Sequence, residues 1–265
     1  MSLSRFFVPL VPFFLAGSLA RRLLNLMGIG SGTAVSGSGE VRAMTQALKR
    51  AGRNGDAPVI FDVGANIGDW TLAALRCFPR AVVHAFEPSA HHQDIYRQAV
   101  GERANVRLAP IALGARDETA SLYKDRDLTG LASLTRRDLG HLGIDMSIRE
   151  EVTVRMLDTY AEEAGVAAID YLKLDVEGHE LDVLKGAGRM IAEGRIAAIQ
   201  FEFGGCNIDT RTYFRDFYRL LAGVGYSIYV IRPGGSLAPI LKYREFYEQF
   251  ATTNYVAILD KQVGG

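Results

Sequence analysis

VIFDVGANIGDWTL, residues 59–72, is the stretch of sequence that decides the fold. Apolar residues surround Asp62, a Gly-Ala-Asn-Ile-Gly turn follows at 64–68, and a helical pattern begins at Trp70. This order predicts a buried parallel strand, a tight glycine turn and the start of a helix. Gly64 and Gly68 carry no Cβ, so we expect the turn to let a ligand approach both the backbone and the free N–H groups of the helix.

Strands and helices are predicted to alternate along the rest of the chain. Apolar runs predict further strands at 81–86, 105–109, 119–123, 152–156, 169–175, 196–203, 226–231 and 255–259, and helical patterns lie at 40–52, 89–101, 181–191 and 210–222. This alternation predicts a parallel α/β sheet with both faces covered, in which ligands bind at the carboxyl ends of the strands. Residues 124–150 have many charges and little periodicity, which predicts a long loop or lid.

Composition excludes some classes of function. The 265 residues include 30 Lys and Arg and 30 Asp and Glu, so the formal net charge is zero. A general nucleic-acid binder normally has a basic excess, and this balance argues against that class. Cys77 and Cys206 have no short spacing between them, which indicates neither a disulfide framework nor a zinc site. We therefore expect a reduced, cytoplasmic location.

The N-terminal segment differs from the rest of the chain because it has an apolar run at residues 6–17. A spanning helix needs about 20 residues, and Pro9 and Pro12 would disturb one. Arg21 and Arg22 lie in a short basic amphipathic pattern that follows. Three interpretations stay open, namely a packing or oligomer segment, a peripheral membrane contact and a cleaved signal peptide. The expected organisation is an N-terminal segment of residues 1–38, ending in a Gly/Ser-rich linker, and one domain of residues 39–265.

Two acids near the glycine turn predict a ligand that contains adenosine. Asp62 lies in a buried strand, where a carboxylate needs a partner such as a ligand ammonium; helix capping is its structural alternative. Glu87 follows the next strand, 25 positions after Asp62. A carboxylate there can accept hydrogen bonds from both hydroxyls of a ribose. The alternative interpretation of Glu87 is a surface acid before the turn at Pro88.

The glycine turn reads G-x-N-x-G rather than the G-x-G-x-x-G of nicotinamide enzymes, and here the chain resembles S-adenosylmethionine-dependent methyltransferases of the class I fold. Four motifs occur in one order, DVGANIG at 62–68, FEP at 86–88, ALG at 112–114 and LKLDVEGHE at 172–180. Together they resemble the FkbM family of methyltransferases over about residues 58–205, and the last motif is the most specific of them.

The resemblance implies a Rossmann-like, mostly parallel sheet of seven strands whose last strand is antiparallel, with helices on both faces. It also implies S-adenosyl-L-methionine as the cofactor and methyl transfer to oxygen, commonly on sugar or polyketide hydroxyls. Carried over to this sequence, the cofactor contacts are Asp62, Gly64, Asn66 and Gly68 at the methionine end, Glu87 at the ribose, and Ala112, Leu113 and Gly114 near the adenine.

A sugar hydroxyl is a poor nucleophile at neutral pH and benefits from a base or a metal. Asp175 is the first candidate, as the base or as a ligand to the cofactor's amino group. Glu177, His179 and Glu202 are the next candidates. Each also has a purely structural interpretation: Glu177 could cap the next helix, His179 could be a surface residue, and Glu202 could be a salt-bridge partner. Asp175, Glu177 and Glu202 also offer oxygens of the kind that bind Mg²⁺, so the need for a divalent metal stays open.

The sequence therefore predicts an S-adenosylmethionine-dependent O-methyltransferase that acts on a hydroxyl of a sugar, a glycan or a related natural product. An NAD-dependent oxidoreductase is the alternative enzyme, and the missing G-x-G-x-x-G weighs against it. A non-catalytic scaffold protein that retains the fold is the alternative outside the enzymes. The expected partner is a small-molecule or glycan acceptor, and no nucleic-acid partner is expected. Peripheral membrane contact through the N-terminal segment and a homo-oligomer both stay open.

Overall fold

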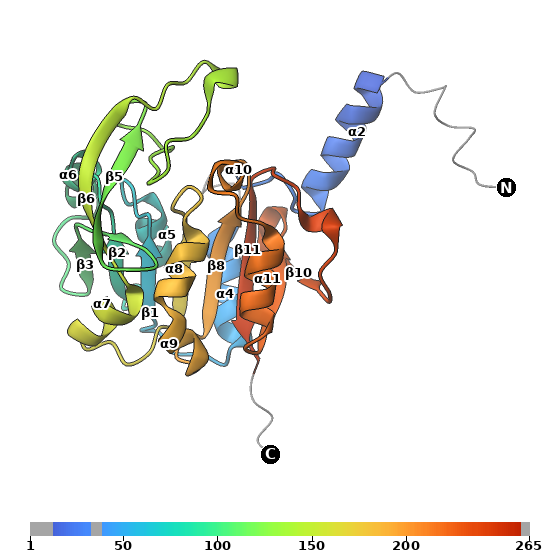
Figure 1. Ribbon diagram of the computed structural model, residues 1–265. Coiled ribbons are helices and arrows are strands. Elements are labelled where there is room, and N and C mark those ends of the chain that lie inside the picture. The colour runs from blue at the N-terminus through green and yellow to red at the C-terminus, as the bar shows by residue number, and fades with distance from the viewer. Residues whose placement is uncertain (1–12, 33–38, 261–265) are drawn as a thin grey trace.

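A large sheet forms the centre of the computed structural model, which describes residues 13–32 and 39–260. Its eight strands have the order β10-β9-β11-β8-β7-β1-β2-β3 (Figure 1). β11 runs antiparallel between β8 and β9, β10 runs antiparallel to β9, and the other neighbours are parallel. The strands are β1 Val59–Val63, β2 Val82–Phe86, β3 Val106–Ala109, β7 Tyr171–Leu174, β8 Ala198–Phe203, β9 Tyr226–Ile231, β10 Leu237–Ile240 and β11 Thr253–Leu259.

Helices cover both faces of this sheet. One face packs against α4 (Glu40–Arg50), α5 (Asp69–Cys77) and α6 (Ala90–Val100), and the other against α7 (Leu157–Glu163), α8 (Glu180–Gly186), α9 (Gly188–Ala192) and α11 (Phe214–Ala222). Successive strand residues point to opposite faces, so Ile60 packs with α4 and α5 whereas Phe61 packs with Tyr160 of α7. Strands buried on both faces are mostly apolar, as β1 is apart from Asp62, which is why β1 could be recognised in the sequence. This arrangement confirms the predicted α/β fold class.

The sheet has one strand more than the expected seven. The extra strand is β10, which forms because the 3-10 turn at Pro233–Gly235 reverses the chain after β9. β10 contains Pro239, a residue that cannot donate to a ladder and is tolerated at the edge of a sheet. The addition leaves the parallel part of the sheet as predicted.

A second sheet of three strands stands beside the first, in the order β4-β6-β5. It contains β4 (Ala112–Leu113), β5 (Glu118–Lys124) and β6 (Ile148–Arg155), and the last two pair along their whole length. The predicted strands at 119–123 and 152–156 are therefore present, with β6 beginning earlier than expected. Residues 125–147 form the predicted long loop, which includes the 3-10 turn η1 (Gly140–Leu142) and folds back so that Ser133 and Tyr123 exchange two backbone hydrogen bonds.

The helix α2 (Phe13–Leu26) projects from the body of the molecule (Figure 1). Residues 28–32, the first part of the expected Gly/Ser linker, pack against the sheet, because Gly30 N–H donates to Thr253 Oγ1 at 3.0 Å and Ile29 is buried. Residues 33–38 and most of the apolar run at 6–17 lie outside the described residues. Within the described part of the chain, no helix combines the length and the apolar character needed to cross a membrane.

Candidate active site

The glycine turn after β1 is held by contacts within the protein. Gly64 has a φ of 79°, and a Cβ there would lie 1.8 Å from the carbonyl oxygen of Asp175. Gly68 has a φ of 95°, and a Cβ there would meet the side chains of Val100 and Tyr96 on α6. Packing within the protein is thus a reason for these glycines that was not predicted, and ligand approach to the backbone at Gly64 stays a prediction. Both positions need glycine for the left-handed backbone and for packing.

Asp62 is fully buried and has partners from the protein. Its Oδ2 accepts a hydrogen bond of 2.6 Å from the Thr71 hydroxyl, and its Oδ1 lies 3.3 Å from Nζ of Lys173. Lys173 is itself buried and also lies 3.3 Å from Asp175. Burial alone lowers the pKa of Lys173, but the carboxylates of Asp62 and Asp175 raise it above the ordinary lysine value. The buried carboxylate thus has a cationic partner without any ligand.

A cleft opens at the carboxyl ends of β1, β2 and β7, which is the edge of the sheet where ligands bind in open α/β folds. The cleft brings together most of the predicted site residues and adds residues 129–130 and 132–134 of the long loop. Those that line it are Gly64, Asn66, Glu87, Ala112, Leu113, Asp175, Glu177 and His179, whereas Asp62, Gly68, Gly114 and Glu202 are not part of its lining.

Glu87 is 6% exposed and sits at the cleft wall, where it is not the surface acid of the alternative interpretation. Its two carboxylate oxygens accept hydrogen bonds of 2.9 Å from the backbone N–H groups of Asn66 and Ser89. Burial raises the pKa of Glu87 to about 7, although these two hydrogen bonds favour the charged form. Each oxygen keeps a lone pair for a ligand donor, which is what two ribose hydroxyls would require.

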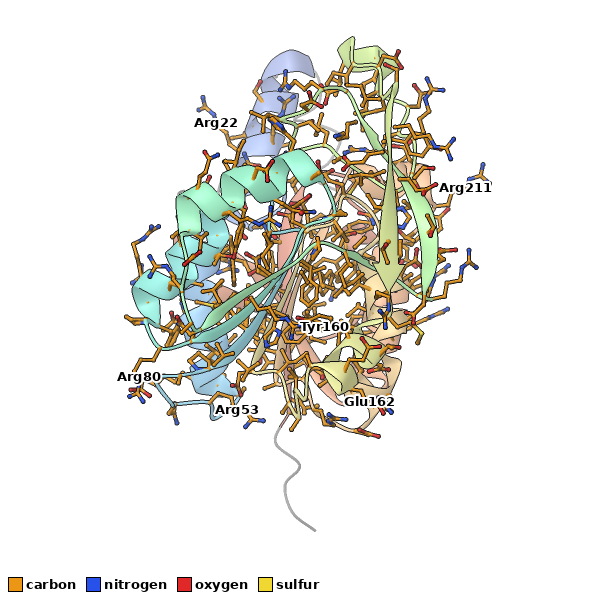
Figure 2. All side chains as sticks on the ribbon, turned by 90° about the vertical axis from the view of Figure 1, so that its left-hand side faces the viewer. Arg22, Arg53, Arg80, Tyr160, Glu162 and Arg211 are labelled. Atoms are coloured by element: carbon orange, nitrogen blue, oxygen red, sulfur yellow. The ribbon has the colours of Figure 1, made fainter. Side chains whose placement is uncertain are left out.

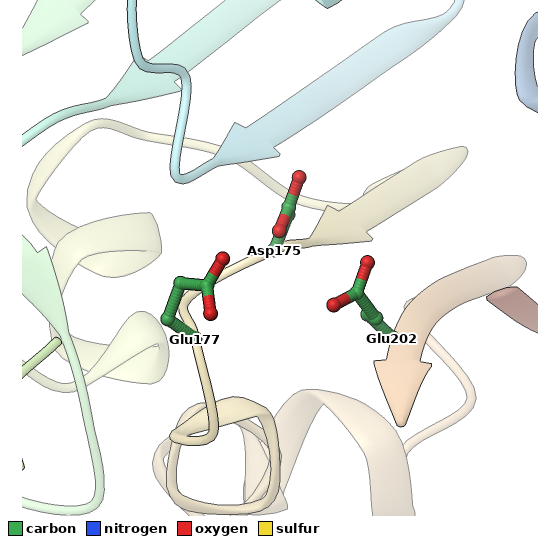
Figure 3. Close-up of side chains that lie close together, drawn as sticks. All are labelled: Asp175, Glu177 and Glu202. Atoms are coloured by element: carbon green, nitrogen blue, oxygen red, sulfur yellow. The ribbon is translucent and has the colours of Figure 1, made fainter. Parts of the chain in front are cut away.

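The acidic trio, Asp175, Glu177 and Glu202, gathers at the ends of β7 and β8 (Figure 3). One oxygen from each of the three carboxyl groups lies within 4.8 Å of the others. Asp175 and Glu177 follow β7 directly, and Glu202 is the next-to-last residue of β8, which pairs in parallel with β7. Because parallel strands end at the same edge of a sheet, this register brings distant residues of the sequence together.

Charges within the acidic trio are only partly balanced. Lys173 contacts Asp175, and Nη1 of Arg137 donates to Glu177 at 2.5 Å. For Glu202, the structure shows neither a hydrogen bond nor an ion pair of its side chain within residues 13–32 and 39–260. Burial and the neighbouring carboxylates raise the pKa of Glu202 well above its usual value. Burial and Asp175 likewise raise the pKa of Glu177 to about 8, against the opposite effect of Arg137.

The loop that follows β7 is closed by its own side chains. Glu177 has a left-handed φ of 51°, and Glu180 is fully buried and accepts hydrogen bonds from the N–H groups of Val176 and Gly178. His179 contacts Asp182 through Nδ1 at 3.2 Å and the Thr135 hydroxyl through Nε2 at 2.9 Å. The structural alternatives are therefore wrong for two candidates: Glu177 pairs with Arg137 and does not cap a helix, and His179 lines the cleft.

Several residues of the site were not predicted from the sequence. Arg137 and Ser133 lie in the long loop, and the Ser133 hydroxyl donates to the carbonyl oxygen of Glu177 at 2.8 Å. His92 lines the cleft beside Glu87, with Nδ1 of His92 3.8 Å from Oε1 of Glu87, and burial lowers the pKa of His92. Lys173 offered one signal, because a lysine inside an otherwise apolar strand requires a buried acid as its partner. Arg137 and Ser133 offered no such signal in the sequence, because no periodicity relates the long loop to β7.

The model of the methyltransferase FkbM domain matches residues 62–228. The chain belongs to the FkbM family of methyltransferases. The recognition from four motifs is thereby confirmed, and those motifs lie within the matched region of the FkbM domain.

Three curated relatives show how the FkbM chain compares with proteins of named activity. It is 28% identical over 156 residues to the 2-O-methyltransferase NoeI of Sinorhizobium fredii, covering 54% of this chain and 63% of that one. It is 36% identical over 161 residues to the 31-O-demethyl-FK506 methyltransferase FkbM of Streptomyces tacrolimicus, covering 51% and 60%. It is 28% identical over 148 residues to the hexuronic acid methyltransferase AglP of Haloferax volcanii, covering 55% and 56%. Each match thus spans less than two thirds of the relative's own length.

Proposed function

We propose that this protein is an S-adenosylmethionine-dependent O-methyltransferase that acts on a hydroxyl of a glycan or a related natural product. The observation that carries the proposal is the position of the acidic trio at the rim of a cleft whose wall holds Glu87. Glu87 suits an adenosyl ligand, and the acidic trio suits removal of a proton from the acceptor. The names of two relatives specify methylation at oxygen, and a third names a hexuronic acid, which supports a hydroxyl acceptor.

The reaction needs one bond to form as another breaks. The acceptor oxygen attacks the methyl carbon of the sulfonium, the carbon–sulfur bond breaks, and its electron pair returns to sulfur as S-adenosylhomocysteine forms. The proton of the hydroxyl passes to a carboxylate of the acidic trio. Asp175 and Glu177 both belong to the cleft and to the trio, but Glu177 is held by Arg137, so Asp175 is the candidate base. His179 has protein partners at both ring nitrogens, so we assign it to holding the loop that contains Glu177.

Replacement of Glu87 by glutamine is expected to weaken the binding of S-adenosylhomocysteine by about 10- to 100-fold, because a hydrogen bond to a charged group contributes about 1.5–3 kcal/mol. Isothermal titration above pH 7, where the Glu87 carboxyl is mostly ionised, measures this effect. Glu151→Gln, on the exposed side of β6, is the matched control and should bind as the parent does. Equal affinities for the two variants would remove Glu87 from the cofactor site.

Methyl transfer is expected to increase as the pH rises through about 8, since Glu177, the neighbour of the candidate base Asp175 in the acidic trio, has a pKa of about 8. Ionisation of Glu177 adds a negative charge beside Asp175, and that charge favours transfer of the acceptor proton to the trio. Arg137→Gln should move this increase to still higher pH, because Arg137 lowers the pKa of Glu177. Rates at saturating cofactor and acceptor, measured across this pH range, test both statements.

Rates of methyl transfer measured in the presence of EDTA test whether the acidic trio needs a divalent metal ion. Lys173, which Asp175 shares with Asp62, and Arg137 supply positive charge to the trio, and the raised pKa of Glu202 lets that carboxyl hold a proton, so activity should survive chelation. If EDTA abolishes transfer and Mg²⁺ restores it, a divalent cation bound by the carboxylate oxygens takes the place of that proton.

The proposed function itself is tested by mass spectrometry of glycan and polyketide hydroxyl acceptors incubated with the protein and S-adenosylmethionine. The proposed function is supported if an acceptor gains one methyl group on oxygen and if S-adenosylmethionine and S-adenosylhomocysteine both bind in isothermal titration. Binding of NAD alone would favour the oxidoreductase alternative. Cofactor binding without transfer to any acceptor in the panel would favour the scaffold alternative.

A further inference from the structure

The projecting helix α2 exposes a continuous apolar face. Leu19, Leu23 and Leu26 are 57%, 53% and 69% exposed, and Met27 is 45% exposed. Residues at these spacings lie on one side of a helix. Gathered apolar side chains of this kind on a surface mark an interaction site, whereas single exposed leucines do not.

Two arginines flank this apolar face: Arg21 lies on the opposite side of α2, and Arg22 borders the face, three residues after Leu19 and four before Leu26. Arg21 and Arg22 are exposed, and Arg22 points away from the body of the molecule (Figure 2). Residues 13–32 contain no Asp or Glu. A second copy of α2 would bring further arginines to the interface and no acid to pair with them, whereas anionic lipid headgroups complement this charge.

The root of α2 is fixed to the sheet next to the acidic trio. Gly30 N–H donates to Thr253 Oγ1, and Gly32 N–H donates to the carbonyl oxygen of Thr252 at 3.2 Å. Thr253 pairs with Phe203, the residue after Glu202. A Cβ on Gly28 would lie 2.6 Å from the carbonyl oxygen of Ile231, at the end of β9. α2 therefore arises from the same edge of the sheet as the candidate active site.

We propose that α2 lies on an anionic membrane surface, with its leucines in the acyl boundary and its arginines among the headgroups. A basic amphipathic helix of 14 residues fits this position, since it is shorter than the about 20 residues that span a bilayer. The anchored root brings the acidic trio to the bilayer surface, where the acceptor hydroxyl would be presented. The statement about the acceptor rests on the proposed function, whereas the membrane contact does not.

Flotation of the full chain with lipid vesicles tests the membrane contact. The protein should float with vesicles that contain phosphatidylglycerol and not with pure phosphatidylcholine, and salt should weaken the association. Replacing Arg21 and Arg22 together by glutamine should weaken binding by about 30-fold, because each basic residue near an anionic surface contributes about a factor of five. Leu19→Ala combined with Leu23→Ala should weaken it by at least about tenfold through lost apolar burial.

Matched controls distinguish membrane binding through α2 from non-specific binding by other surface arginines and from the methyl-transfer activity. Arg76→Gln combined with Arg80→Gln removes two exposed arginines from the body, where Figure 2 shows Arg80 far from Arg22, and should float as the parent does. All variants should bind S-adenosylhomocysteine normally, so loss of flotation is distinct from failure of the proposed function. Absence of flotation, or equal flotation of the α2 variants, would overturn the proposal. A dimer that the leucine variants dissociate, without vesicle binding, would assign this face to a second copy.

Discussion

Replacement of Asp175 by asparagine is expected to lower kcat by about 10²- to 10⁴-fold, the range that a positioned general base contributes. Asparagine keeps the shape of the side chain but cannot take the proton that the acceptor hydroxyl loses. Asp175 is the member of the acidic trio that also lines the cleft and contacts Lys173. Single-turnover rates with saturating cofactor measure the chemical step, and titration with S-adenosylhomocysteine reports any separate loss of binding.

Glu202→Gln is the companion variant, because Glu202 belongs to the acidic trio but does not line the cleft. It should lower kcat while the affinity for S-adenosylhomocysteine stays within a factor of about two, since no ligand contact is removed. If Asp175→Asn weakens cofactor binding and leaves kcat unchanged, Asp175 holds the cofactor's amino group. If both variants turn over at the parent rate, the catalytic assignment is wrong while the fold and the family stand.

The part of the site that could be predicted is the part built from local sequence. β1, its glycine turn and α5 follow one another in the chain, and Glu87 could be placed because it follows the next strand directly. Asp175 and Glu202 could be expected near each other because the carboxyl ends of parallel strands meet at one edge. The hydrophobic pattern and the positions of the strand ends were sufficient to predict where these residues lie.

The remaining contacts depend on how distant segments fold onto each other. Arg137 reaches Glu177 only because β5 and β6 carry the loop between them back over the cleft, and that path has no periodic signal in 124–150. The packing reason for glycine at position 64 could not be predicted for a similar reason. The carbonyl oxygen that excludes a Cβ at Gly64 comes from Asp175, more than a hundred positions later in the sequence.

Replacement of Lys173 by methionine is expected to lower the free energy of unfolding by about 3–5 kcal/mol, the cost of leaving a buried charge without its partner. The side chain of Lys173 is 4% exposed and that of Asp62 is 0% exposed, so water cannot take the place of the ammonium. The Thr71 hydroxyl remains as a hydrogen-bond donor to Asp62 but carries no charge. Asp175, at 44% exposed, stays solvated and adds little to this loss.

Urea unfolding of three variants isolates the buried pair. Lys185→Met removes a half-exposed lysine that pairs with Asp182, and it should cost no more than about 1 kcal/mol, as exposed ion pairs do. Asp62→Asn combined with Lys173→Met removes both charges and should be more stable than Lys173→Met alone, because no carboxylate is left unpaired. Equal stabilities for the single and double variants would mean that Asp62 without Lys173 costs no stability, so the ion pair does not stabilise the fold. Lys173 would then act mainly through packing, with Nζ 5.8 Å from the centre of the Trp70 ring.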